Sequence, residues 1–287
     1  MPNLENYLTF SHWQYEVVRH LLQLTIASFL AGLVYFAMTA KNTAPRFRTA
    51  AVISAVVMVS AALEIAQLAL LWNSAFTFDG VRWAATQPER FSNGARYVNW
   101  SIDVPMLLAQ LLVVLGLSGG AFWKRWWPLA IAGLLMIWTG YVGQFHEPQI
   151  AGVEAGDSSP FWIWFWISCV PFAVVLVLVT RLVLRPPEPL APAPTAQLRL
   201  CYGILLGSWL LYPLAYAMPG LWPTAEGMVL RQALYTAADI TSKLIFGIAL
   251  GRFAGMRSLE EGWKPAQTQA GEVQADAPVV QREATVT

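Results

Sequence analysis

Charged residues are scarce in this chain of 287 residues. Asp, Glu, Lys and Arg make up 12% of it, about half the usual fraction of a soluble domain, whereas 56% is hydrophobic. A mean hydropathy of +0.49 and 14 tryptophans favour a membrane protein, in which tryptophan anchors helices at the interfaces. The net charge of +1 offers no basic surface to a polyanion, so we expect no nucleic-acid partner.

Cysteine is also rare. Cys169 and Cys201 both lie in apolar stretches, so they are interpreted as small buried side chains and imply no disulfide framework. The first residues, MPNLENYLTF, lack the charged start and apolar run of a signal peptide. We find no internal repeat and expect no second globular domain.

Long apolar runs are abundant by contrast, and seven of them are long enough to cross a bilayer. Each is predicted to be a helix, because a lipid-facing backbone must satisfy its own hydrogen bonds. They cover residues 16–40, 47–73, 96–120, 126–145, 160–184, 198–219 and 228–252. The predicted fold class is therefore an all-α membrane protein with seven transmembrane helices in a lipid bilayer.

Basic residues predict the orientation. They concentrate in the connections after the first, third and fifth segments and after the seventh, which places the N-terminus outside and the C-terminus in the cytoplasm. The predicted division is an outer cap (1–15), a seven-helix domain (16–257) and a disordered cytoplasmic tail (258–287). The outer connection 74–95 can form a short β-hairpin around Asp79 and Gly80, and the Pro-rich stretch 185–197 predicts an extended linker.

One polar stripe interrupts the last apolar segment. Arg231, Tyr235, Asp239 and Lys243 recur every four residues, so they share one face of a helix. Lys243 is the only lysine inside a long apolar segment, and an ionisable group at that depth is costly enough to suggest a function. The alternative is a structural buried ion pair between Lys243 and Asp239.

Two other segments carry matching polar faces. In the third segment one face holds Arg96, Asn99, Asp103 and Gln110, and in the second Ser60 and Glu64 lie one turn apart. None of these groups can face lipid, so they must face one another and Lys243.

A desolvated lysine can form a Schiff base with a carbonyl compound, and Asp103 and Asp239 are candidate counterions. Aromatic residues favour a slot for a flat apolar molecule. The candidates are Trp100, Trp209, Tyr212 and Pro213, with Gly140 and Gly143 leaving room beside Trp138 and Tyr141. Ordinary aromatic packing is the alternative for each of them taken alone.

Three motifs in order, RYxxW…P in the third segment, WxxYP in the sixth and DxxxK in the seventh, resemble those of the microbial rhodopsins. The resemblance implies a multi-pass protein of a bacterial inner membrane, with all-trans retinal held by Lys243 as a protonated Schiff base. It implies that Trp100, Trp209, Tyr212 and Pro213 clamp the polyene, with Gly140 beside them. Leu107 occupies the colour-tuning position at which leucine goes with green absorption.

The trio Asn99, Asp103 and Gln110 resembles that of the light-driven sodium pumps called NDQ rhodopsins, as do the longer stretches SAVVMVSA, NWSIDVPMLL, GYVGQF and LYPLAYAMP. The resemblance implies an outward Na⁺ pump, not an enzyme, that moves H⁺ when Na⁺ is absent. A proton pump is one alternative, since Asp103 can accept a proton whatever follows. A retinal photosensor or channel, and a receptor or transporter without retinal, are the others.

The family pattern assigns further roles. Asp103 is the counterion and proton acceptor, and Na⁺ is held transiently by Asn99, Asp103, Ser60 and Asp239. Arg96 gates the exit, while Glu5, Glu147 and Arg231 match an outer release cluster; the alternative for both glutamates is a solvated surface charge. Gln110 cannot donate a proton, Ser54 and Gly251 match the uptake side, and Ala51 stands where a polar residue is expected.

Glu64 is the main departure from that pattern, because relatives carry an apolar residue there. We hypothesise that a protonated Glu64 donates a hydrogen bond to Asp103; the alternative is an ion pair with Arg96. Phe165 stands where carotenoid-binding relatives have glycine, so we expect no carotenoid antenna. His20 and Glu89 match positions that meet between protomers, which predicts a pentamer.

Overall fold

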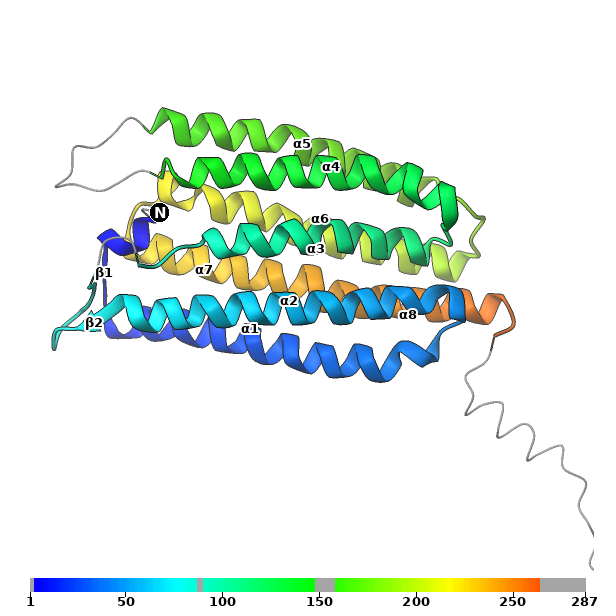
Figure 1. The fold of residues 1–287 in the computed structure, drawn as a ribbon, viewed down its shortest axis with the longest axis horizontal. Helices are drawn as coiled ribbons and strands as arrows, with labels where there is room; N and C mark the ends of the chain where they lie inside the picture. The colour runs from blue at the N-terminus through cyan, green and yellow to red at the C-terminus, as the bar shows by residue number, and fades with distance from the viewer. Residues whose placement is uncertain (1–2, 87–89, 148–157, 264–287) are drawn as a thin grey trace, which may run out of the picture.

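A computed structural model describes residues 3–86, 90–147 and 158–263 of the chain. Within these ranges, seven helical stretches are long and apolar enough to cross a membrane, which confirms the predicted fold class. They are α1 (His12–Thr39), α2 (Pro45–Ala75), α3 (Gly94–Val114), α4 (Gly119–Gln144), α5 (Ser159–Leu184), α6 (Pro192–Leu221) and a seventh helix in three parts. Its parts are α7 (Ala225–Asp239), the π-helical turn η3 (Ile240–Ile245) and α8 (Phe246–Glu260). The helices run side by side in one bundle (Figure 1).

Several helix ends differ from the prediction. Helix α3 ends at Val114, not at residue 120, because Gly116 adopts φ +82°, which stops a helix. Helix α4 consequently begins earlier, at Gly119. Helix α6 begins at Pro192, where a first-turn proline loses no hydrogen bond, so only 185–191 form the linker predicted over 185–197.

The first and the last helix are both longer than predicted. Ser11 and Gln14 form a capping box at the start of α1, so residues 12–15 are helical and do not belong to the cap. At the other end α8 continues through Glu260, past the predicted start of the tail at residue 258, because Ser258 bonds back to Ala254 and to the Ala44 backbone. The rest of the predicted tail, from residue 264, lies outside the described residues.

The outer end of the bundle carries a small sheet. Strands β2 (Phe76–Phe78) and β3 (Trp83–Ala85) form the hairpin expected around Asp79 and Gly80, and Gly80 takes φ +101° in the turn. The backbone N–H groups of Arg82 and Val81 donate to the Asp79 carboxylate and lower its pKa. An unpredicted third strand, β1 (Thr9–Phe10), pairs with β3 and follows the short 3₁₀ helix η1 (Leu4–Tyr7), so the N-terminal segment is tied to the hairpin.

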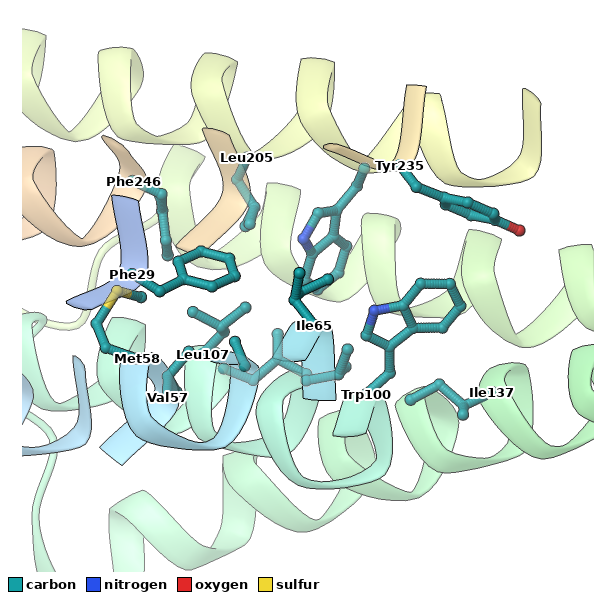
Figure 2. Packing of buried hydrophobic residues seen from close by; sticks show 14 of the residues in the cluster. Phe29, Val57, Met58, Ile65, Trp100, Leu107, Ile137, Leu205, Tyr235 and Phe246 are labelled. Atoms are coloured by element: carbon teal, nitrogen blue, oxygen red, sulfur yellow. The ribbon is translucent and has the colours of Figure 1, made fainter. Parts of the chain in front are cut away.

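The helices differ in how much they bury, and this places the polar residues. In the most apolar window of α3, 72% of the residues are buried, whereas in that of α5 only 17% are. Helix α3 is therefore the central helix, and its polar face cannot reach lipid. Figure 2 shows the apolar packing around it: Phe29, Met58 and Phe246 cluster beyond Leu107, while Tyr235 and Trp100 lie farther along.

Candidate functional site

Lys243 lies at mid-length of the seventh helix, within the π-helical turn η3. Such turns inside α-helices often mark functional sites, because they shift the side chains out of the regular register. The side chain is buried, and its Nζ lies 2.5 Å from Asp239 Oδ1 and 3.5 Å from Asp103 Oδ2. The predicted meeting of the third and seventh segments at this lysine is present in the structure.

The two carboxylates have different surroundings. Asp239 accepts hydrogen bonds from Arg96 Nη1 at 2.8 Å and from the Tyr212 hydroxyl at 2.8 Å, in addition to Lys243. Neither oxygen of Asp103 has a hydrogen-bond partner among the described residues, and its nearest cation is Lys243. Asp239 is thus the better stabilised anion, and Asp103 is the carboxylate more easily protonated.

A cavity beside Lys243 lies between α3, α4, α5, α6 and the seventh helix. Its empty space, part of which is open to the surroundings, is about 750 Å³, and its lining is mostly apolar. All seven residues predicted to bind a flat ligand line it: Lys243, Trp100, Trp209, Tyr212, Pro213, Gly140 and Leu107. The cavity combines one lysine with aromatic walls, so it suits a flat, apolar molecule attached to that lysine.

Sequence reasoning missed part of this wall, and three residues expected at the slot, Gly143, Trp138 and Tyr141, do not line the cavity. Tyr97, Met136, Phe172 and Tyr216 also line the cavity, and only their position on inward helix faces could have indicated it. Trp138, expected beside the slot, is 55% exposed on the outside of α4. Its place on the helix, two residues before Gly140, turns it toward lipid, where its indole N–H donates to Ser101 Oγ at 3.2 Å.

The other predicted residues of α3 carry amides next to hydroxyls. Asn99 Nδ2 donates to Ser60 Oγ at 2.7 Å, and Asn99 Oδ1 has no hydrogen-bond partner among the described residues. Toward the inner end, Gln110 Nε2 donates to Ser54 Oγ. The positions on either side of Asp103 along this face therefore hold neutral amides whose oxygens accept no hydrogen bond from the described part of the chain.

A second cavity, with about 940 Å³ of empty space, opens at the inner end between α1, α2 and the seventh helix. Gln110 and Ser54 form its deep end, and Ala51 and Gly251 line it closer to the surface. The four residues that the sequence linked to ion uptake thus share one cavity. Because position 51 is an alanine, the wall is apolar where we expected a polar group.

Glu64 is buried in α2, with 8% of its surface exposed, near Arg96, Asp239, Lys243 and Asp103. Neither of its carboxyl oxygens has a hydrogen-bond partner within the described ranges. Both contacts hypothesised from the sequence, a hydrogen bond to Asp103 and an ion pair with Arg96, are therefore absent. Arg96 is instead engaged by Asp239 and by Gln232 Oε1 at 3.1 Å, which accounts for the missing ion pair.

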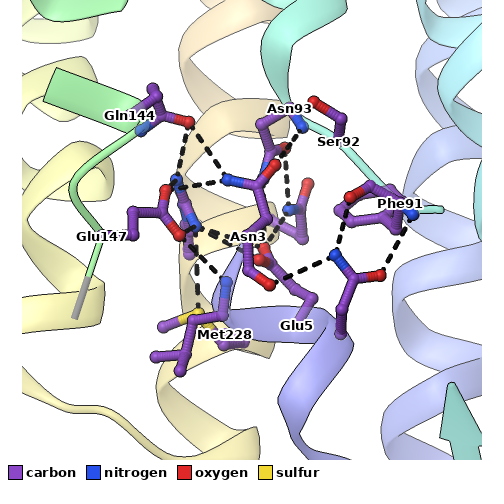
Figure 3. A network of polar contacts seen from close by, with 12 residues as sticks. Asn3, Glu5, Phe91, Ser92, Asn93, Gln144, Glu147 and Met228 are labelled. Atoms are coloured by element: carbon purple, nitrogen blue, oxygen red, sulfur yellow. Dashed lines mark hydrogen bonds and ion pairs between the residues drawn. The ribbon is translucent and has the colours of Figure 1, made fainter. Parts of the chain in front are cut away.

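The outer cluster is assembled and buried (Figure 3). Arg231 lies 3.2 Å from Glu5 Oε2 and 2.5 Å from Glu147 Oε1, and all three side chains are inaccessible to solvent. The alternative of solvated surface charges for the two glutamates is therefore wrong. Burial raises the pKa of Glu147, which Arg231 lowers and Glu5 raises further, since two carboxylates share one guanidinium.

Gln232 joins this cluster to the centre of the bundle, and sequence reasoning missed it. Its Nε2 donates to Glu5 Oε1 at 2.8 Å, and its Oε1 accepts from Arg96. Asn93 completes the connection by donating to Glu5 Oε1 at 3.2 Å. The signal was available, because a glutamine next to Arg231 in an apolar segment needs a buried partner.

The residues predicted to meet between protomers are only partly described. His20 lies on α1 with its side chain 64% exposed, 3.8 Å from Glu16. Glu89 lies outside the described residues. Phe165, expected to block a carotenoid, lines the cavity beside Tyr216, at a ring-centroid distance of 5.5 Å.

Comparison with known proteins agrees with this geometry. The family model described as "Bacteriorhodopsin-like protein" matches residues 16–255. Green-light absorbing proteorhodopsin from Gamma-proteobacterium EBAC31A08 is 23% identical over 237 residues, which is 80% of this chain and 84% of that protein. Halorhodopsin from Halorubrum sodomense is 28% identical over 162 residues, 55% of this chain and 51% of that protein.

Two solved structures cover more of the chain. Thermophilic rhodopsin is 30% identical, with a TM-score of 0.80, and the alignment covers 89% of this chain and 99% of that one. Xanthorhodopsin, described as a light-driven ion pump with dual chromophore, is 27% identical, with a TM-score of 0.78 and the same coverage.

Proposed function

We propose that this chain, which belongs to the bacteriorhodopsin-like family of microbial rhodopsins, is a light-driven outward sodium pump. Members of the family are multi-pass membrane proteins with a retinal chromophore on a lysine. One observation carries the choice of ion. Asp103, beside Lys243, is flanked along α3 by the amides of Asn99 and Gln110 and not by further carboxylates. Along this face of α3, Asp103 can accept one proton, and the flanking amides of Asn99 and Gln110 cannot supply another.

The cavity residues fit retinal. Lys243 supplies the attachment point, Trp100 and Trp209 supply flat apolar walls, and Asp103 and Asp239 supply negative charge beside the nitrogen. All-trans retinal carried there would supply light absorption and a change of shape that displaces the proton on the Lys243 nitrogen. Leucine at position 107 supports a green-absorbing pigment.

Asp103 accepts that proton. Its oxygens have no hydrogen-bond donors in the described part of the chain, whereas Asp239 keeps its charge through Arg96 and Tyr212. The transfer neutralises Asp103 and the Lys243 nitrogen together. A positive charge repels a passing cation strongly at low dielectric, so neutralisation lowers the barrier for Na⁺ at this point.

Oxygen ligands then hold the cation briefly, as a hard ion requires. Asn99 Oδ1 accepts no hydrogen bond from the described residues, and Ser60 Oγ lies 2.7 Å from the amide nitrogen of the same side chain. Asp239 and Asp103 complete the proposed transient Na⁺ site. When Asp103 returns its proton to the Lys243 nitrogen, the restored positive charge blocks backflow.

The remaining route uses the two ends of the bundle. We propose that Na⁺ enters through the inner cavity to Gln110, whose amide can coordinate a cation but cannot donate a proton to the centre. Arg96 gates the exit, and the cluster of Glu5, Glu147 and Arg231 receives the ion. Gln232 couples the two, since it bonds Arg96 and Glu5.

Glu64 belongs to the same electrostatic group. Asp103 and Asp239 balance Arg96 and Lys243, so an ionised Glu64 would leave one uncompensated negative charge in a buried site. We propose that Glu64 is protonated when Asp103 is ionised and that it tunes the pH range over which Asp103 stays ionised.

We also propose a pentamer in a bacterial plasma membrane, with His20 at the contact face and no carotenoid antenna beside Phe165. Cells that express the holoprotein test the central proposal in NaCl and in KCl. Passive alkalinisation in light that a protonophore increases in NaCl supports Na⁺ export, and acidification in KCl supports H⁺ export when Na⁺ is absent. Acidification abolished by the protonophore in both salts would identify a proton pump instead.

A further inference from the structure

A basic groove lies between the inner ends of α4 and α5, on the opposite side of the bundle from the proposed ion entrance. Its charged lining consists of Lys124 and Arg125 at the start of α4 and of Arg181 and Arg185 at the end of α5. Pro128 is among the apolar residues beneath them, and the groove holds about 1280 Å³ of open space. No acidic side chain of the described residues lines it.

These four cations are uncompensated. Within the described part of the chain, none of them forms an ion pair with an acidic side chain. Arg125 only donates to the Ala121 carbonyl, at 3.4 Å. Other arginines at the same end behave differently, since Arg46 and Arg257 both pair with Glu188. The basic groove therefore presents a positive charge that the described residues do not neutralise.

An apolar groove continues from the basic one along the outside of α5. It shares Leu178 and Arg181 with the basic groove and is walled by Val170, Val174 and Val177. This face of α5 is exposed to lipid over much of its length, with Val170 at 66% exposure. Polar and apolar parts thus join end to end, in the order of a lipid headgroup and its acyl chain.

We propose that the two grooves together bind one anionic phospholipid of the cytoplasmic leaflet. Its phosphate lies among Lys124, Arg125, Arg181 and Arg185, and one acyl chain follows α5 past Val174. Charge complementarity selects an anionic headgroup, because basic residues next to a membrane-spanning helix attract anionic lipids of the cytoplasmic leaflet. The basic residues predict that this end faces the cytoplasm. The proposal is independent of which ion the protein moves.

Native mass spectrometry of the delipidated holoprotein, titrated with phosphatidylglycerol or with phosphatidylcholine, tests this site. The expected result is one tightly bound phosphatidylglycerol, with an affinity about tenfold above that for phosphatidylcholine. The double variant Arg181→Gln/Arg185→Gln should lose that preference. The double variant Lys41→Gln/Arg199→Gln removes two exposed basic residues at the same end but outside both grooves, and should keep it.

Two further measurements complete the test, one as a control for folding and one to distinguish a lipid from free phosphate. The visible absorption spectrum of each variant should match that of the wild-type protein, which shows that the fold and chromophore are intact. Inorganic phosphate at 100-fold excess should not displace the lipid, because it cannot occupy the apolar groove. Four results would each overturn the proposal. These are equal binding of both lipids, an unchanged preference in the Arg181/Arg185 variant, an equal loss of preference in the control variant, and displacement of the lipid by phosphate.

Discussion

Asp103 Oδ2 lies 3.5 Å from Lys243 Nζ, and neither oxygen of Asp103 accepts a hydrogen bond from the described residues. Asp239, on the other side of the same nitrogen, is held by Arg96 and Tyr212 as well. We propose that this asymmetry between two carboxylates around one lysine determines which of them takes the proton. The predictions below follow from it and from the networks at the two ends of the bundle.

Asp103→Asn should abolish light-driven transport and shift the absorption maximum to longer wavelength, because the negative charge that localises the positive charge on the Lys243 nitrogen is lost. Asp103→Glu, which keeps the carboxylate, should retain the pigment and measurable transport. Absorption spectroscopy and flux measurements on the same preparations check this. Full transport by the Asn variant would contradict the assigned role.

Glu64→Leu should change the dependence of colour on pH, because removing one buried acid alters the electrostatic interactions that determine when Asp103 ionises. Glu64→Gln keeps the shape without a titrating group, and should behave like the leucine variant. A spectrophotometric pH titration of the purified pigment measures both. If the two curves coincide with that of the wild-type protein, Glu64 has no electrostatic influence on Asp103.

Arg231→Leu should destabilise the fold strongly, since it leaves Glu5 and Glu147 buried without their shared cation. Removing one partner of a buried ion pair typically costs about 3–5 kcal/mol. Glu5→Gln should cost less, because Arg231 keeps Glu147 and the new amide can still accept from Gln232. Unfolding monitored by loss of visible absorbance ranks the variants, and a smaller effect of Arg231→Leu than of Glu5→Gln would be inconsistent with the network.

Glu188, at the inner end of the bundle, makes a pH-dependent contribution to the stability of the fold. Its partial burial favours a higher pKa, but hydrogen bonds and charge from Arg257 and Arg46 outweigh this and lower the pKa of Glu188. A carboxylate with a lowered pKa in the folded state stabilises the fold at neutral pH. That stabilisation is complete above the unfolded pKa and disappears as pH falls through the folded pKa.

Glu188→Gln should therefore lower the melting temperature at pH 7 and have little effect below about pH 3, where the wild-type carboxyl is also protonated. Glu16→Gln, which removes a partly exposed ion pair with Arg19 one helical turn away, serves as the control and should change little at either pH. If Glu188→Gln lowered the melting temperature equally at both pH values, the ion pairs of Glu188 would not contribute to stability.

The sequence predicted the transmembrane fold and the cavity for clear physical reasons. A backbone in lipid must be helical, and charges at that depth must meet one another, so hydropathy and spacing were enough to bring Asp103, Asp239 and Lys243 together. Seven predicted ligand-binding residues that belong to a motif or to a longer family-like stretch line the cavity, whereas Gly143, in the same stretch as Gly140, does not.

What the sequence left undetermined depends on distances between helices. Periodicity placed Glu64 on the correct face but could not show that Arg96 is already occupied by Asp239 and Gln232. Hydropathy could not reveal that Pro192 begins a helix. The aromatic residues of α4 suggested that Trp138 lies beside the ligand slot, but its side chain is exposed on the outside of the bundle. The basic residues at the ends of α4 and α5 indicated only the orientation, because a groove that combines two helices cannot be predicted from either one.

The most direct test of sodium pumping is light-driven transport of ²²Na⁺ into inside-out vesicles that contain the purified holoprotein and a protonophore. The protonophore collapses any proton gradient. Accumulation of the isotope then has two possible causes, primary Na⁺ transport by the protein or passive Na⁺ movement driven by a membrane potential. Valinomycin with equal K⁺ on both sides holds the membrane potential at zero and removes the second route. Outward sodium pumping predicts accumulation under illumination that Asp103→Asn abolishes. No accumulation above the dark level under these conditions, with proton uptake intact in the absence of protonophore, would contradict it.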